Sequence, residues 1–295
     1  MADFHALTFE SEDISLDIKF NLTQEQVSFF DSFGYLRFDG MLADCIEEID
    51  EEFEMVWRER GGGHDGNPHN GKSRSCIVPF IDQRERLSAL IDDPRILGIA
   101  IPLLGDDFNY MGSDGNYYVG DTGWHSDGWH PSIRHIKIAI YLDPLSKETG
   151  CLRVIPGSHL IDDAYAKSLQ KHIGKSEEFW NVTGRDLPAV SLNVTPGDVL
   201  VFNHNTKHAS FGGNDHRRMF TVNLCQRYPE GQIPDLRQYI ASAARFWIEE
   251  AYGPAMIRTA SPARMIHLEQ VMANDDHLPE LVRKAKETMS EPSRG

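Results

Sequence analysis

The sequence lacks an apolar run long enough to cross a membrane. No segment approaches about eighteen consecutive apolar residues, the minimum that suggests a membrane-spanning helix. The opening stretch, MADFHALTFESED, also lacks the basic region and apolar region of a secretory leader. We therefore expect a protein that is not embedded in a membrane and that works in the cytoplasm.

Positive charge is scarce as well. The 295 residues include 29 Lys and Arg against 45 Asp and Glu, which gives a formal net charge of −16. Proteins that bind nucleic acid neutralise phosphates with concentrated Lys and Arg, and no such concentration is present. Nucleic acid is therefore not an expected partner, and the sequence leaves the oligomeric state open.

Cysteine is rare and widely spaced. The chain has four cysteines and no C-x-x-C spacing, so neither a zinc site nor a disulfide framework is indicated. We expect free thiols, most of them buried, at Cys45, Cys76, Cys151 and Cys225.

What is present divides into three parts by hydrophobic periodicity. Helical patterns cover residues about 22–104 and 233–289, and short β patterns cover about 109–226. The length suits one domain, residues 1–295. Short strands separated by Gly, Pro, Asp and Asn are typical of a sandwich or barrel. The strands expected in the middle part are residues 116–119, 136–142, 152–155, 190–194, 199–202 and 220–225.

Several local patterns predict boundaries outside this β region. Thr23 and Gln26 have the spacing of a helix capping box, and Gly34 is expected to end that helix. Residues 61–71, GGGHDGNPHNG, predict an irregular, mobile loop, with closure over a substrate as the alternative. Residues 162–173 are expected to form an inserted helix, followed by an irregular segment. One further helix is expected to hold Arg245, Phe246, Trp247, Ile248 and Tyr252.

A histidine and an aspartate two positions apart form a candidate metal pair. In an extended strand this spacing would place His125 and Asp127 on one face. One imidazole and one carboxylate are two thirds of the facial triad that holds non-haem Fe(II) and leaves coordination positions open. The interpretation depends on a third ligand.

That third ligand must be an imidazole from elsewhere, and three histidines follow downstream. His208 lies just beyond the expected strand 199–202, at the end where a jelly roll would present a ligand. Small residues after His208 let the backbone approach a bound group. We therefore choose His208 over His204, and we place His216 in a turn.

The open positions of such an iron are usually filled by a 2-oxo acid, whose far carboxylate needs a buried cation with a forked donor geometry. Arg217 or Arg218 could supply it. Neighbouring residues of a strand face opposite sides, so only one of the two can point inward.

These pieces occur in one order along the chain, and the segment from Asn116 to Leu224 resembles the phytanoyl-CoA dioxygenase family of Fe(II)- and 2-oxoglutarate-dependent oxygenases. The region from Thr23 to Leu42 is also similar to the N-terminal part of that family. The residues that carry the resemblance are His125-Ser126-Asp127, Thr149-Gly150-Cys151, Pro156-Gly157-Ser158-His159, Pro196-Gly197-Asp198, His208-Ala209-Ser210 and Arg217-Arg218.

The resemblance implies a mainly β fold with flanking helices, a double-stranded β-helix or cupin-like jelly roll. It implies that Fe(II) is held by the catalytic residues His125, Asp127 and His208. It further implies that 2-oxoglutarate is held by Arg217 rather than Arg218, with contacts from Ser210 and Asn116. The connection before His125 is shorter than the family pattern, which affects the placement of Asn116.

Other side chains near the metal pair are candidates for binding the substrate. Trp129 and His130 could form a substrate wall, or they could be core and structural residues. Lys137 and Tyr141 share one strand face, opposite Ile136, Ile138 and Ile140. If the isoleucines face an outer layer, Lys137 and Tyr141 enter the cavity; otherwise both are exposed.

The function implied is that of a dioxygenase that uses Fe(II), 2-oxoglutarate and O2 to hydroxylate a small organic molecule, with succinate and CO2 as coproducts. One alternative is a related enzyme that catalyses halogenation, desaturation or cyclisation. Another is a cupin-like module that binds a metal or a small molecule without turnover. Formation of succinate would separate the enzymes from the module.

Overall fold

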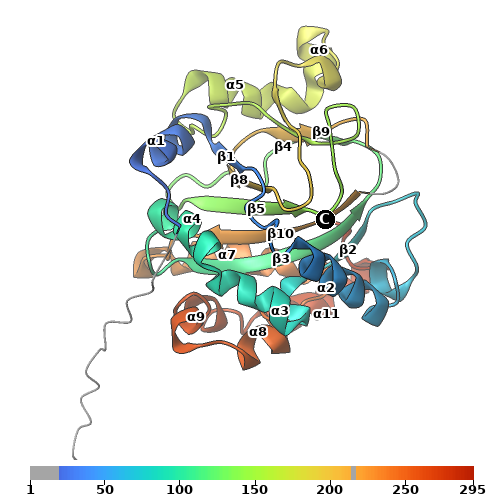
Figure 1. Cartoon of the computed structure of the whole chain (residues 1–295), viewed down its shortest axis with the longest axis vertical. Coiled ribbons are helices and arrows are strands. Elements are labelled where there is room, and N and C mark those ends of the chain that lie inside the picture. The colour runs from blue at the N-terminus through green and yellow to red at the C-terminus, as the bar shows by residue number, and fades with distance from the viewer. Residues whose placement is uncertain (1–19, 214–216) are drawn as a thin grey trace, which may run out of the picture.

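Two antiparallel sheets face each other at the centre of the computed structural model, which describes residues 20–213 and 217–295 (Figure 1). The larger sheet has the strand order β1-β8-β5-β10-β3-β2, and the smaller has the order β4-β9-β6-β7. The strands are β1 Tyr35–Phe38, β2 Ser75–Ile77, β3 Asn109–Tyr118, β4 Thr122–His125, β5 His135–Tyr141, β6 Leu152–Val154, β7 Val190–Leu192, β8 Val199–Asn203, β9 His208–Ser210 and β10 Arg217–Cys225. Facing sheets of short strands agree with the sequence prediction.

The alternation of side chains along β5 separates an outer apolar layer from an inner cavity. Ile136, Ile138 and Ile140 are fully buried in the main hydrophobic core. Lys137 and Tyr141, on the other face, line the cavity between the sheets. Of the two alternatives that the sequence left open for this strand, the inward orientation is therefore correct.

The first helix and strand form as their sequence predicts. Helix α1, Gln24–Phe33, begins after Thr23, whose hydroxyl accepts a hydrogen bond from the backbone N–H of Gln26 at 3.3 Å. The side chain of Gln26 accepts in turn from the N–H of Thr23 at 2.9 Å, which completes the capping box. Gly34 ends the helix with φ of 81°, a left-handed conformation that glycine adopts without strain.

Helices cover the outer face of the larger sheet. Helix α2, Ile46–Glu59, buries Ile49, Phe53, Val56 and Trp57, and Phe53 contacts the ring of Phe220 in β10. Figure 1 shows α2 with α3 and α4 on the side of this sheet that faces away from β4 and β9. The remaining helices on the flanks are α3 Glu85–Ser88, α4 Pro94–Leu104, α7 Ile233–Ala241, α8 Pro254–Arg258, α9 Pro262–Ile266, α10 Glu269–Met272 and α11 Leu278–Thr288.

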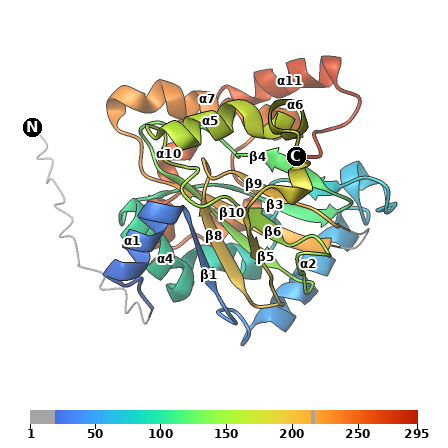
Figure 2. The same ribbon diagram turned by 90° about the horizontal axis from the view of Figure 1, so that it is seen from above.

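The smaller sheet is covered by an insertion between β6 and β7, which Figure 2 shows from above. Helix α5, Ala164–His172, confirms the helix expected near residues 162–173. A second short helix, α6 Ser176–Trp180, lies in the segment expected to be irregular. Leu169 and Ile173 pack with the aromatic residues Trp124 and Phe211, which anchors the insertion over β4 and β9.

Two expectations for the regions that flank the β core need correction. The helix expected around residues 245–252 is absent: Ser242–Phe246 is a 3-10 turn, and Trp247 has φ of 59°, which ends helical geometry. The 61–71 loop is irregular apart from a short turn, but it is packed. The ring of His64 is buried and hydrogen-bonds the carbonyl oxygens of Cys76 and Pro292 at 3.1 and 2.9 Å.

Two further properties of the described residues bear on the composition. No helix in this part of the chain is long and apolar enough to cross a membrane. The cysteines are free, as expected, and three of the four are buried.

Candidate active site

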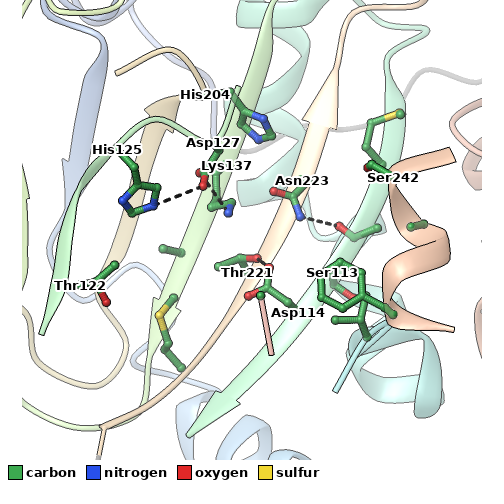
Figure 3. A pocket seen from close by; sticks show the side chains of 18 of the residues that line it. Ser113, Asp114, Thr122, His125, Asp127, Lys137, His204, Thr221, Asn223 and Ser242 are labelled. Carbon is green, nitrogen blue, oxygen red and sulfur yellow. Dashed lines mark hydrogen bonds and ion pairs between the residues drawn. The ribbon is translucent and has the colours of Figure 1, made fainter. Parts of the chain in front are cut away.

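The space between the two sheets is a cavity of about 730 Å³. Its walls combine the inner faces of β3, β5 and β10 with β4, β9 and the chain around α7 (Figure 3). All three residues predicted as metal ligands line this cavity, as do Arg217, Ser210, Lys137 and Tyr141. Charged and polar side chains from distant segments therefore meet in one partly open cavity.

Two of the predicted ligands meet because their strands pair in register. Residue His125, at the end of β4, is directly opposite His208, at the start of β9, and the ring centroids are 4.2 Å apart. The sequence did not predict these strands, because each has only three or four residues and includes polar or glycine positions. Antiparallel pairing is therefore what brings together two imidazoles that are far apart in sequence.

Asp127 supplies the third donor, but not by the geometry that the sequence suggested. Strand β4 ends at His125, so Asp127 lies in a bend rather than on the same strand face. Its Oδ1 atom lies 3.8 Å from Nε2 of His125 and 3.8 Å from Nε2 of His208. The donor atoms of the three residues lie within 4.8 Å of one another, so the group can share one ion.

In His125 and His208 the hydrogen bonds to the protein use Nδ1, so Nε2 of each ring stays available for a metal. Nδ1 of His125 bonds the carbonyl oxygen of Gly123 at 2.8 Å, and Nδ1 of His208 bonds that of Thr206 at 3.0 Å. Such bonds fix the proton on Nδ1 and leave a lone pair on Nε2. Two imidazoles and one carboxylate fit the facial donor set for Fe(II).

Lys137 controls the electrostatics of this group. Its ammonium lies 3.0 Å from Oδ2 of Asp127, the carboxylate oxygen that does not face the histidines. Burial is the largest single influence and raises the pKa of Asp127, but Lys137 together with the neighbouring His208, His204 and His125 outweighs it and holds that pKa far below its usual range. Burial lowers the pKa of His208 to about 4, so this imidazole is neutral and able to ligate near pH 7.

Arg217 points into the cavity and Arg218 points away from it. The guanidinium of Arg217 is buried, and it donates to the carbonyl oxygen of Gly150 at 2.8 Å and to the hydroxyl of Ser210. Arg218 instead pairs with Asp143 at 2.9 Å and with two acidic residues of α2. The alternation of strand β10 therefore selects Arg217 as the cation that faces the cavity.

The two predicted helper residues differ in their placement. Ser210 lines the cavity, and its hydroxyl donates to the carbonyl oxygen of Gly150 at 2.8 Å. Asn116 is fully buried and is not among the cavity-lining residues; its side-chain oxygen accepts from Arg74, and its amide donates to Asp114. This placement does not favour direct contact between Asn116 and a cosubstrate beside Arg217.

Two further residues predicted to contact substrate also lie outside the cavity lining. The ring of Trp129 faces the ammonium of Lys207, with Nζ 4.9 Å from the ring centroid. His130 stacks on His135, with centroids 3.8 Å apart. A structural role for Trp129 and His130 is therefore favoured over a role in contacting substrate.

Sequence reasoning missed a polar group at the far end of the cavity. Asp114 on β3 is half-buried, forms an ion pair with Arg74 at 3.4 Å and accepts a hydrogen bond from Thr221. Figure 3 shows Asp114, Thr221 and Asn223 along the same wall as Lys137. No short motif marks these positions, and only the alternation along β3 and β10 could have indicated that they point inward.

The sequence offered two other histidines, His204 and His216, as alternatives to His208 for the third ligand. His204 lines the cavity but belongs to a separate group with His130 and His135. His216 lies outside the described residues.

Solved structures with a similar fold are known. The carbocyclase SnoK from nogalamycin biosynthesis matches with a TM-score of 0.54 and 22% identity, over 70% of this chain and 85% of that chain. The apoform of EctD from S. alaskensis matches with a TM-score of 0.54 and 22% identity, over 70% and 78%. These likenesses confirm the predicted jelly-roll fold.

The sequence comparisons give the family. The ectoine dioxygenase of Sphingopyxis alaskensis is 27% identical over 227 residues, 65% of this chain and 71% of the relative. That of Nocardia farcinica is 29% identical over 213 residues, 63% and 71% respectively. The match to the family described as phytanoyl-CoA dioxygenase (PhyH) covers residues 30–219, well over half of the chain. This protein therefore belongs to the phytanoyl-CoA dioxygenase family.

Proposed function

We propose that the cavity is the active site of an Fe(II)- and 2-oxoglutarate-dependent dioxygenase, in which His125, Asp127 and His208 hold the iron. The observation that carries the proposal is the convergence of two Nε2 atoms and one carboxylate oxygen on the wall of the cavity between the sheets. The same cavity contains the buried guanidinium of Arg217. Family membership supports the same class of enzyme.

The chain's own residues position the reactants. Arg217 receives the far carboxylate of 2-oxoglutarate, and its bonds to Gly150 and Ser210 fix the direction of its guanidinium. Lys137 holds the carboxylate oxygen of Asp127 that faces away from the histidines, so the other oxygen keeps its direction. When bound, the iron with 2-oxoglutarate and O2 supplies the oxidation, which yields succinate, CO2 and an oxidised substrate.

A small organic substrate fits the rest of the cavity, beside Asp114, Thr221 and Asn223. These groups can donate and accept hydrogen bonds, and Asp114 adds negative charge. Ectoine is the first compound to test, because relatives at 27% and 29% identity are ectoine dioxygenases. A compound with both polar and charged groups suits this wall better than a hydrocarbon.

Desaturation or cyclisation is the second candidate reaction. The structural neighbours include a carbocyclase and an epimerase from nogalamycin biosynthesis, at 22% and 18% identity. The same arrangement of protein ligands and cosubstrate would serve such a reaction. The product, rather than the metal site, distinguishes the candidates.

The experiment is to incubate the protein with Fe(II), 2-oxoglutarate and labelled O2, first with ectoine and then with pools of metabolites. Succinate that depends on the protein and is absent with D127A supports the enzyme; absence of succinate in every pool would favour a binding module. Mass spectrometry of the product separates the reactions. Hydroxylation adds one labelled oxygen atom, whereas desaturation and cyclisation add none.

Three broader expectations remain predictions. We infer that residues 1–295 form a single oxygenase domain, because the flanking helices share one core with the larger sheet. A cytoplasmic location and the absence of a nucleic-acid partner rest on the composition alone.

A further inference from the structure

A second group of histidines lies beside the first. His130, His135 and His204 each offer a ring nitrogen, and these atoms lie within 4.8 Å of one another. They come from three segments: the loop after Asp127, the first residue of β5, and the turn after β8. Figure 3 shows His204 at the cavity, near Asp127 and Lys137.

Several of these nitrogens are buried without a protein hydrogen bond. Among the described residues, neither ring nitrogen of His204 has a partner, and the same holds for Nδ1 of His135 and Nε2 of His130. His135 and His204 are only 1% and 2% exposed. Each unsatisfied buried polar atom costs about 1 to 3 kcal/mol, so a bound group that satisfies several of them would be strongly favoured.

The spacing of the rings suits a shared ion at two of the three contacts. The centroid of His204 lies 5.4 Å from that of His135 and 5.7 Å from that of His130. Two imidazoles on one tetrahedral ion, with metal–nitrogen bonds of about 2.0 to 2.1 Å, have centroids roughly 5 Å apart. His204 is therefore already placed to share an ion with either ring.

The third contact requires one ring to turn. His130 stacks on His135 at 3.8 Å with 12° between the ring planes, too parallel for both lone pairs to meet at one point. His130 is the ring that can move, because it lies half-buried on a loop, whereas His135 is held by the hydroxyl of Tyr228 at 2.8 Å. Asn205 bonds the backbone N–H and carbonyl of His130 and so holds the backbone in place while the side chain turns.

The chemistry of the group selects the kind of ion. Burial lowers the pKa of His204 to about 3 and that of His135 well below its ordinary value, so these rings are neutral and need lose no proton to ligate. Three imidazoles without a carboxylate favour Zn²⁺ and other late first-row divalent ions over Mg²⁺ and Ca²⁺, which prefer oxygen. The negative charge of Asp127 acts on His204 and favours a cation there, against a smaller opposing effect of Lys137.

We propose that His130, His135 and His204 form a second metal site that binds Zn²⁺ or a similar late first-row ion, separate from the site at His125, Asp127 and His208. The ion enters from the cavity, because His204 lines its wall. A bound ion would tie the loop after Asp127 to the start of β5 and to the turn after β8. It would also break the stack between His130 and His135.

The test counts metal ions on the full-length protein. Chelator-treated protein is loaded with Zn²⁺, passed through a desalting column and analysed by mass spectrometry for metal. We expect two equivalents for the wild type, one for H125A/H208A, one for H130A/H204A and none when all four histidines are replaced. H172A, which alters a histidine on α5 outside both groups, should keep two.

A second measurement uses Co²⁺ in the H125A/H208A background, where only the proposed site remains. Four-coordinate Co²⁺ absorbs visible light strongly, and a stack of rings without metal gives no such band. H130A alone should weaken Zn²⁺ binding in this background at least about a hundredfold, since the loss of even an outer-shell partner costs up to that much. Because His130 lies on a loop, this variant should fold even if a change at buried His204 does not.

The outcomes are distinct from those that test the proposed oxygenase. One equivalent in the wild type and none in H125A/H208A would overturn the second site. So would a second equivalent that survives H130A/H204A, because it would lie elsewhere. None of these readouts requires turnover, so failure of the dioxygenase assay leaves this test intact.

Discussion

The ammonium of Lys137 lies 3.0 Å from Oδ2 of Asp127, while Oδ1 of the same carboxylate lies 3.8 Å from Nε2 of both His125 and His208. Asp127 thus divides its two oxygens between an ammonium and the proposed metal position. Without a metal, Lys137 is the cation that balances this half-buried carboxylate. With a divalent ion in place, the carboxylate has two cationic neighbours.

This division predicts different effects of K137M on the two states of the protein. Breaking a fully buried ion pair costs about 3 to 5 kcal/mol, and this pair is only partly buried, so the metal-free protein should lose stability by somewhat less than that amount. The iron-loaded protein should lose much less, because iron compensates Asp127. Urea denaturation of both states measures this. Equal losses in both would show that Lys137 does not act through Asp127.

Replacing any one of His125, Asp127 and His208 by Ala should abolish iron binding in the cavity. Each variant removes one of three donors, and among the described residues no other His, Cys, Asp or Glu belongs to this group. The visible charge-transfer band of Fe(II) chelated by 2-oxoglutarate should disappear, while circular dichroism stays unchanged. H172A is the control. A full band in H208A would move the ligand to His204.

The adjacent arginines give a matched pair of variants for the cosubstrate. R217A leaves the far carboxylate of 2-oxoglutarate without its partner, at a cost of roughly 2 to 5 kcal/mol. The apparent affinity for 2-oxoglutarate should therefore fall at least about thirtyfold. R218A should leave this affinity nearly unchanged but lower stability, because Arg218 pairs with Asp143 and with Asp50 and Glu54 of α2. If R218A rather than R217A lost affinity for 2-oxoglutarate, Arg218 would be the residue that binds its carboxylate.

Asp82 predicts a component of stability that declines as pH rises. Burial raises the pKa of Asp82 to about 6, although its carboxylate accepts hydrogen bonds from Tyr110 at 2.5 Å and from the N–H of Gly253 at 3.0 Å. The folded carboxyl keeps its proton to a higher pH than the unfolded one. Folding therefore takes up a proton between about pH 4 and 6, and the contribution of Asp82 falls by about 3 kcal/mol across that range.

The comparison of wild type with D82N isolates this component from other titrations. The free energy of unfolding of the wild type minus that of D82N, measured with urea from pH 4 to pH 7, should decrease as pH rises. If the value for the wild type minus that for D82N instead increases with pH, the folded protein favours the ionised carboxylate of Asp82.

The sequence was sufficient where a local pattern determines the outcome. The capping box at Thr23 follows from neighbouring residues, so the helix start could be predicted. Alternation along β10 required only that one of Arg217 and Arg218 point inward, and the family resemblance selected Arg217, which lines the cavity. Strands β4 and β9 could not, because each is too short to show a period and depends on pairing with the other. The group around Asp114 forms only when β3, β10 and the segment before β2 meet, and no motif encodes that meeting.

Among the described strands, β4 is the outermost member of the smaller sheet and pairs there with β9 alone. An outer strand of four residues is weakly held and leaves one row of backbone donors and acceptors unpaired. A metal bound by His125 and His208 would link β4 to β9, because these two residues are directly opposite each other in the paired strands. Loss of the metal would then loosen this edge strand and expose the sheet edge to pairing with other chains. Resistance to proteases and to aggregation should therefore both decrease when the metal is removed.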